Sequence, residues 1–132
     1  MHTTQMTVRG FHLDVYQHVN NARFLEFLEE ARWQMFEDIP LISFIRKKNL
    51  AFVLANININ FLRPALINEV LDIQSQLIRI GSKSAVLGQK IFLSKTKNQI
   101  VDATVTFCIL NQTTHKTVPL TGEVYTLLED MI

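Results

Sequence analysis

The sequence lacks several features that would point to particular classes of protein. A single cysteine, Cys108, leaves no partner for a disulfide bond within the chain. No linker, repeat or low-complexity segment interrupts the 132 residues, so we expect one domain over residues 1–132. The N-terminus has no apolar signal core, and no apolar run reaches membrane-spanning length. These absences predict a cytoplasmic chain with no membrane partner.

Charge is also scarce. Only 19% of the residues are charged, and 13 basic against 12 acidic side chains leave a net charge of +1. That balance gives no electrostatic basis for binding nucleic acid. Hydrophobic residues make up 48% of the chain, and its mean hydropathy of +0.14 is high for a soluble monomer. We therefore expect some apolar surface to be buried against another subunit, in a homodimer or homotetramer.

The clearest helical periodicity runs from about residue 21 to residue 37. Apolar side chains recur there at the spacing of one helix face: Phe24, Phe27, Leu28, Ala31 and Met35. Polar residues occupy the opposite side, on which Trp33 also falls, and Pro40 marks the end of the helix. Weak alternation over residues 4–12 predicts a short strand before this helix, and residues 41–48 predict a short helix or turn after it.

Period-two patterns then predict several strands. Within residues 52–61, Ile57, Ile59 and Phe61 alternate with asparagines. Further strands are expected at 70–80, 84–93 and 100–110, and a short helix or tail at 122–131. This order indicates an α+β domain in which one helix packs on an antiparallel sheet that could wrap around it.

Polar side chains gather just before the predicted long helix: Asp14, Tyr16, His18, Asn20 and Asn21. One interpretation is structural, with Asn20 capping the helix and Asp14 interacting with the positive end of its dipole. The other is catalytic: a free amide at the helix start polarises a carbonyl, while Asp14 attacks it or deprotonates a water. A thioester would suit such a site, because a thiol with a pKa of about 8.5 leaves as thiolate without an acid.

The stretches HLDVYQHVNNARFLEFLEEAR and NININFLRPALINEVLDIQSQL resemble the hotdog-fold acyl-CoA thioesterases of the 4-hydroxybenzoyl-CoA thioesterase type. Within that type the chain is most similar to the bacterial long-chain acyl-CoA thioesterase III group, from about Val8 to the last strand. The resemblance implies a hotdog fold, in which a long central helix is wrapped by an antiparallel sheet. It also implies active sites at subunit interfaces and hydrolysis of long-chain fatty acyl-CoA to free acid and CoA, with no cofactor.

The same resemblance assigns roles to individual residues. Asp14 corresponds to the catalytic base or nucleophile, and the backbone amide of Asn21 to the oxyanion donor. His18 matches a histidine to which we assign a positioning role. The expected substrate-binding residues are Tyr16, Asn20 and Arg63. Many relatives have a glycine in this loop, whereas this chain has Tyr16 and Gln17, which changes the shape expected for the pocket mouth.

Other catalytic groups are less well supported. His12, Asp14 and His18 have no recognised metal-ligand spacing and lack a fourth ligand, so no metal site is expected. Cys108 lies within an apolar strand and is expected in the core rather than as a nucleophile. On the long helix, Glu29 is a second candidate carboxylate. Its neighbours Glu26 and Glu30 are expected to face solvent.

Binding of the CoA phosphates and the type of reaction both stay open from sequence. The candidate phosphate-binding residues are Arg46, Lys47, Lys48, Arg63, Arg79 and Lys83. Two alternatives to hydrolysis are a non-catalytic acyl-thioester-binding protein and a hydratase or dehydratase acting through Asp14 and His18. Release of free CoA thiol would separate hydrolysis from both.

Overall fold

The computed structural model describes residues 1–132 and contains five strands, three α-helices and one short 3-10 helix. The chain begins with strand β1 (His2–Thr7) and the 3-10 helix η1 (Gly10–His12), which lead into the long helix α1 (Asn21–Glu37). The short helix α2 (Leu41–Lys47) follows. The remaining elements are β2 (Leu50–Phe61), β3 (Val70–Ile80), β4 (Ala85–Leu93), β5 (Gln99–Asn111) and α3 (Glu123–Glu129).

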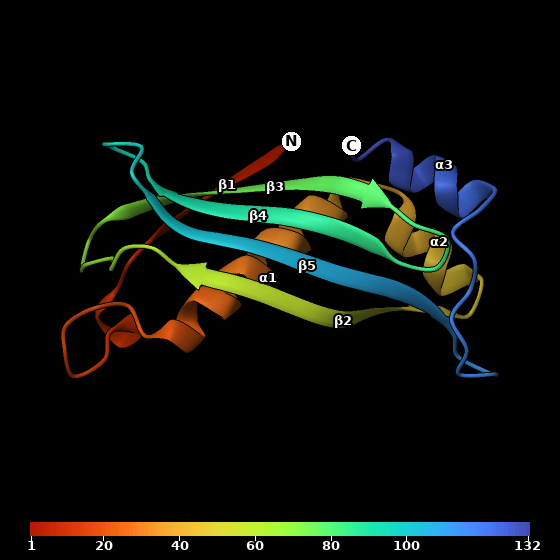
Figure 1. Ribbon diagram of the computed structural model, residues 1–132, viewed down its shortest axis with the longest axis horizontal. Coiled ribbons are helices and arrows are strands. Elements are labelled where there is room, and N and C mark those ends of the chain that lie inside the picture. Colours follow the sequence, from red (N-terminus) through yellow and green to blue (C-terminus); the bar gives the residue numbers. More distant parts are fainter.

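The five strands form one antiparallel sheet in the order β1-β3-β4-β5-β2. Figure 1 shows α1 lying along one face of this sheet and crossing behind the strands, with α2 and α3 together at one end. A long helix held against a curved antiparallel sheet is the arrangement expected of the hotdog fold. The α+β prediction is therefore confirmed.

Helix α1 forms where the spacing of apolar residues predicted a helix, and it does so by burying the predicted apolar face. The five apolar residues of the expected face, Phe24, Phe27, Leu28, Ala31 and Met35, are all buried. They meet apolar side chains that alternate along β3, β4 and β5, such as Ile73, Leu87 and Val105, each fully buried. Because successive strand residues point to opposite faces, only alternate positions of these strands join the core.

The N-terminal strand differs from the prediction of residues 4–12. It pairs with β3 only from His2 to Thr7. The Arg9 N–H then donates to the Nδ1 atom of His12 at 2.8 Å. Val8 still bonds to the segment before β3, since its N–H donates to the Glu69 carbonyl and its carbonyl accepts from the Asn68 N–H, both at 2.9 Å. The chain then turns into η1, so that His12 ends in a helical turn rather than in a strand.

Strand β2 lies at one edge of the sheet and pairs on one side only, with β5. Its register shifts between Leu54 and Asn56, which leaves Ala55 as an extra residue at a bulge. Helix α1 packs mainly on β3 and β1, at the opposite side of the sheet. The space between α1 and β2 is consequently less completely filled, and the cavities described below lie along it.

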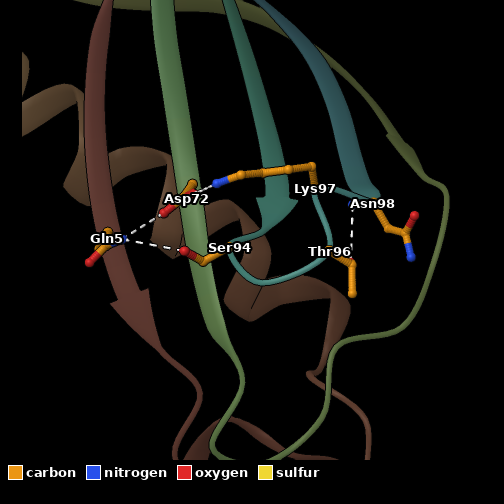
Figure 2. Close-up of polar contacts among 6 residues, drawn as sticks. All are labelled: Gln5, Asp72, Ser94, Thr96, Lys97 and Asn98. Atoms are coloured by element: carbon orange, nitrogen blue, oxygen red, sulfur yellow. Dashed lines mark hydrogen bonds and ion pairs between the residues drawn. The ribbon is translucent and has the colours of Figure 1, made fainter.

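A polar cluster on the face of the sheet opposite α1 connects β1 to its neighbours (Figure 2). The Gln5 amide donates to Asp72 Oδ1 at 2.9 Å and to Ser94 Oγ at 3.5 Å. Lys97 Nζ lies 3.4 Å from Asp72 Oδ2. The cluster joins β1, β3 and the β4–β5 turn through one carboxylate, and it lies apart from the cavities along α1.

No helix of the chain combines the length and the apolar character that crossing a membrane requires.

Candidate active site

The loop that precedes α1 is a tight hairpin. Leu13 and Val19 pair as an isolated antiparallel bridge, and the Asp14 N–H donates to the His18 carbonyl at 2.9 Å. The Gln17 N–H closes the turn on the Asp14 carbonyl at 3.0 Å. Gln17 has a φ of 63°, the left-handed conformation that glycine adopts without strain. The turn therefore has a backbone conformation that suits glycine, although the residue at this position is Gln17.

The Asp14 carboxylate is held from one side only. Its Oδ1 atom accepts a hydrogen bond from the Tyr16 N–H at 2.9 Å. No other hydrogen bond or ion pair in the chain involves this carboxylate, and the residue is half-buried. Asp14 is therefore oriented by the turn and still has an oxygen available for a substrate or a water.

Helix α1 begins with a cap that leaves one amide unused. The Asn20 side chain accepts from the Ala22 N–H at 2.9 Å, and the Asn20 carbonyl accepts from the Arg23 N–H at the same distance. The Asn21 N–H donates to no acceptor of the chain. Because the first amides of a helix have no intrahelical partners, this N–H is a free donor at the positive end of the helix dipole.

One cavity brings these groups together. It has a volume of about 360 Å³ and is lined by Asp14, Tyr16, His18, Val19, Asn21, Phe24, Phe61, Leu62, Arg63 and Pro64. Every predicted site residue except Asn20 therefore borders the same space. Asn20 faces the helix instead, as its N-cap. Of the six basic residues considered for phosphate binding, only Arg63 lines this cavity.

Sequence reasoning predicted an apolar channel between the helix and the facing strands, but it did not identify the strand residues that form the apolar wall of this cavity. Phe61, Leu62 and Pro64 come from the end of β2 and the segment after it, about forty residues beyond the loop that precedes α1. They reach the site because β2 pairs with β5 along its length and the Leu62 N–H continues onto the Ile100 carbonyl at 2.8 Å. No local pattern in the sequence contains this pairing. Phe24 was expected in the core, and it also borders the site.

His12 lies apart from this cavity. Its ring packs edge-on against Phe27, with centroids 4.8 Å apart. Its Nδ1 atom is occupied by the Arg9 N–H, so the proton of the neutral ring lies on Nε2. Burial lowers the pKa of His12, and the positive charge of Arg23 lowers it further, while Glu26 acts in the opposite direction. The chain holds no cluster of three or more His, Cys, Asp or Glu side chains arranged to bind a metal.

The structure also places the other candidate catalytic residues, which are three glutamates of α1 and Cys108. Glu26 is exposed and pairs with Arg23 at 2.9 Å, and Glu30 is exposed and accepts from Gln34; both face solvent as expected. Glu29 borders a different cavity. The placement of Cys108 in the core was wrong: it is half-buried on the face of β5 opposite the buried Phe107 and Ile109, because strand side chains alternate.

Comparison with known proteins identifies the family of the chain. Residues 9–128 match the Thioesterase-like superfamily. The chain is 48% identical over 129 residues to the long-chain acyl-CoA thioesterase FadM of Escherichia coli strain K12, covering 98% of each chain. Its structure is similar to that of YbaW, a probable thioesterase from Escherichia coli, with a TM-score of 0.96 and 47% identity over 100% of this chain and 99% of that one.

A more distant structure shows the same fold. Slr0204, a 1,4-dihydroxy-2-naphthoyl-CoA thioesterase from Synechocystis, has a TM-score of 0.83 at 20% identity and covers 98% of this chain and 96% of its own. The matched segment begins before Asp14 and extends to the last helix, so it contains the whole cavity described above. The chain therefore belongs to the Thioesterase-like superfamily.

Proposed function

We propose that the chain hydrolyses long-chain acyl-CoA thioesters to free fatty acid and CoA. The observation that carries the proposal is the presence of an oriented carboxylate, Asp14, and a free helix N-terminal amide, Asn21, on the wall of one cavity. A relative named for this activity is 48% identical over nearly the whole chain. The choice of a long acyl chain rests on that relative's name and on the apolar cavity wall.

The proposed mechanism uses these two groups in sequence. The thioester oxygen accepts a hydrogen bond from the Asn21 N–H, which strengthens as negative charge develops on that oxygen. Asp14 either removes a proton from a water that attacks the carbonyl carbon, or attacks it directly to form an anhydride that water then opens. The carbon–sulfur bond breaks, and CoA leaves as thiolate. One water is consumed for each acid and thiol formed.

The other lining residues orient the substrate in this proposal. Phe24, Phe61 and Leu62 offer an apolar wall to the first carbons of the acyl chain. Arg63 is exposed and lies at the same cavity, where its guanidinium can pair with a CoA phosphate. His18 and Tyr16 border the space around Asp14, and we assign them positioning and substrate-binding roles.

The proposal includes a cytoplasmic homo-oligomer. One cysteine leaves no disulfide to form within the chain, as is usual for proteins of reducing compartments. Strand β2 exposes an unpaired edge of twelve residues, which a second copy could extend by pairing. Large apolar side chains near its end, Phe61, Leu62, Leu66 and Ile67, are exposed.

The test is thiol release from acyl-CoA substrates of increasing chain length, with the wild type compared to Asp14→Asn. We expect the variant to lose roughly 100-fold or more in kcat, as when a general base is removed, because asparagine can keep the Tyr16 hydrogen bond but cannot take a proton. Asp38→Asn is the matched control, since Asp38 is exposed at the far end of α1. Full activity of Asp14→Asn would rule out the assignment.

The same assay separates the two alternative functions. A non-catalytic acyl-thioester binder releases no thiol. A hydratase or dehydratase acting through Asp14 and His18 changes the acyl chain and leaves the thioester intact. Stoichiometric appearance of CoA thiol and free acid therefore supports hydrolysis alone.

A further inference from the structure

A belt of three polar side chains crosses the core between α1 and the sheet. Two of them, Ser75 of β3 and Gln89 of β4, are an opposed pair and are fully buried. The third, Arg32 of α1, is 8% exposed and contacts Gln89. This polar belt separates two clusters of buried apolar residues. One cluster lies under the first half of α1, and the other lies under its end together with α2 and α3.

The Gln89 side chain uses both of its N–H groups within the core. Its Nε2 atom donates to the Leu28 carbonyl at 3.0 Å and to the Ser75 hydroxyl at 2.9 Å. Its Oε1 atom accepts from Arg32 Nη1 at 3.0 Å. Because a carbonyl only accepts and a guanidinium only donates, these partners fix which end of the amide is the nitrogen. Gln89 therefore has one orientation, which α1 and β3 set together.

The hydrogen bond to Leu28 reaches the backbone of α1. Three side-chain hydrogen bonds connect α1 with the sheet, and two of them involve Gln89. The third joins the Thr4 hydroxyl to the side chain of Gln34 at 2.9 Å. Because a glutamine side chain has several rotamers, that bond leaves the helix axis free to shift. The bond from Gln89 to Leu28 is the one that ties the helix backbone to a strand.

Stability alone does not account for the polar belt. Burying an amide and a guanidinium costs free energy, which their hydrogen bonds offset but do not greatly exceed. Apolar packing is non-directional, whereas a hydrogen bond weakens steeply as its angle departs from linear. A satisfied buried network therefore selects one arrangement of the elements that it joins. For α1, that arrangement is its position along the sheet and its rotation about its own axis.

We propose that Gln89 is a positioning residue for thioester hydrolysis, which sets the place of α1 on the sheet and thereby the place of the Asn21 N–H beside Asp14. Since the reaction is that of the proposed function, the inference rests on it. Leu28 comes seven residues after Asn21 on α1, about 10 Å along the helix axis. Because a helix moves as a rigid body over this length, a shift at Leu28 is also a shift of the Asn21 N–H.

The Asp14 carboxylate does not follow such a movement. The hairpin that carries it is held at its base by the Val19 N–H, which donates to the Ala65 carbonyl at 2.9 Å. Ala65 belongs to the segment between β2 and β3. A displacement of α1 therefore changes the separation of the Asn21 N–H from the carboxylate. A misplacement of about 1 Å in such a pair of groups costs roughly 100-fold in rate.

The test compares Gln89→Glu with the wild type. Glutamate has the shape of glutamine and keeps an oxygen for Arg32, but it places an oxygen instead of a donor against the Leu28 carbonyl. We expect kcat for thiol release to fall roughly 10-fold or more and KM to change by less than about 3-fold, because an oxyanion hydrogen bond acts in the transition state. Thr4→Val is the matched control, since it removes the Gln34 bond at nearly equal size. It should keep the wild-type kcat.

The amide of Asn21 gives a second readout that needs no turnover. In a proton–nitrogen correlation spectrum, we expect its resonance to shift in Gln89→Glu and to stay in place in Thr4→Val. The substituted side chain contacts α1 seven residues away from this amide, so a shift reports a movement of the helix start. A loss of stability alone, with α1 still in place, would not move the resonance.

Ser75→Ala tests the same role with a smaller change in the core. The alanine leaves Gln89 in place and removes the hydroxyl that accepts one of its N–H groups. We expect kcat to fall by roughly 3-fold with KM unchanged, as for the loss of one neutral hydrogen bond, and the Asn21 resonance to shift in the same direction. Should Gln89→Glu fail to fold, this variant carries the test.

The outcomes distinguish this inference from the proposed function. Wild-type kcat in Gln89→Glu, or in Ser75→Ala where Gln89→Glu does not fold, would overturn the positioning role. A fall in kcat without a shift of the Asn21 resonance, a raised KM at wild-type kcat, or an equal fall in Thr4→Val would do the same. If the wild type releases no thiol, the proposed function fails, and the Asn21 resonance still shows whether Gln89 holds α1 in place.

Discussion

His12 shows how a single polar side chain can be structural and still sensitive to pH. It is buried, accepts the Arg9 N–H at Nδ1 and packs against Phe27. Burial and the nearby charge of Arg23 lower its pKa below the ordinary value of 6.5. The folded protein therefore favours the neutral ring, and the unfolded chain takes up the proton first as the pH falls.

The consequence is a loss of stability on the acid side of pH 6.5. Above that value both states carry a neutral His12, and its contribution is complete. Between pH 6.5 and the lower pKa of the folded state, the unfolded state binds more protons. The free energy of unfolding therefore decreases as the pH decreases. Denaturant unfolding of the wild type and His12→Gln from pH 5 to 8 measures the difference. Identical pH profiles for the two proteins would contradict the assignment.

Gln17 is the second residue with a local consequence. Its φ of 63° places a non-glycine residue in the left-handed region within the loop that precedes α1, a conformation that costs roughly 1–2 kcal/mol. Replacement by glycine removes this strain and raises the entropy of the unfolded chain, so Gln17→Gly should change the free energy of unfolding by less than about 0.5 kcal/mol. Gln17→Val should destabilise by about 1–2 kcal/mol, because a β-branched residue is disfavoured there.

Denaturant unfolding of the Gln17 variants checks this order, with Gln17→Asn as the control that tolerates the left-handed region. If valine proved as stable as asparagine, the loop would not have the turn described here. Because the Gln17 N–H closes the turn on the Asp14 carbonyl, we also expect Gln17→Val to lower kcat more than Gln17→Gly does.

At the scale of elements, the first turn of α1 contributes to the stability of the chain and, in the proposed mechanism, to catalysis. The Asn20 side chain caps the helix through the Ala22 N–H, and the next residue carries the free amide. Asn20→Ala should cost about 1 kcal/mol in the free energy of unfolding and lower kcat, because the first turn that carries the Asn21 N–H loses its anchor. Asn20→Ser keeps a capping oxygen and should retain both properties.

Unfolding measurements and thiol-release kinetics on the two Asn20 variants provide the check. A fall in stability without any fall in kcat would show that the Asn21 amide does not depend on the cap, and it would weaken the oxyanion assignment. Unchanged stability in Asn20→Ala would show that the cap contributes nothing.

The elements also show what the sequence could and could not predict. Helix α1 and strands β3, β4 and β5 were predictable because their burial patterns are periodic, at 3.6 or two residues. The bounds of strand β1 were not, because the weak alternation over residues 4–12 does not show that the chain turns into η1 after Val8. That Asp14 and Asn21 border one cavity was predictable, because the two residues are close in sequence. Phe61 and Leu62 were not, because the pairing of β2 with β5 brings them there.

For the whole molecule, the unequal edges of the sheet decide how copies could associate. One edge strand of the sheet is β1, with six residues. The other edge strand is β2, with twelve residues, and its Phe52, Leu54 and Ile57 are only half-buried. A long, apolar and unpaired edge is the part of a sheet that pairs with another chain.

We therefore expect β2 rather than β1 to form the interface of a homodimer. Hydrogen exchange across a dilution series provides the measurement, with sedimentation giving the mass of the species at each concentration. Amides on the outer edge of β2 should be protected in the dimer and exchange faster as it dissociates, because pairing across the two-fold axis would satisfy them. Amides of β1 are the internal control and should exchange at the same rate throughout. Fast exchange of the outer β2 amides at every concentration, in a species of dimer mass, would place the interface elsewhere.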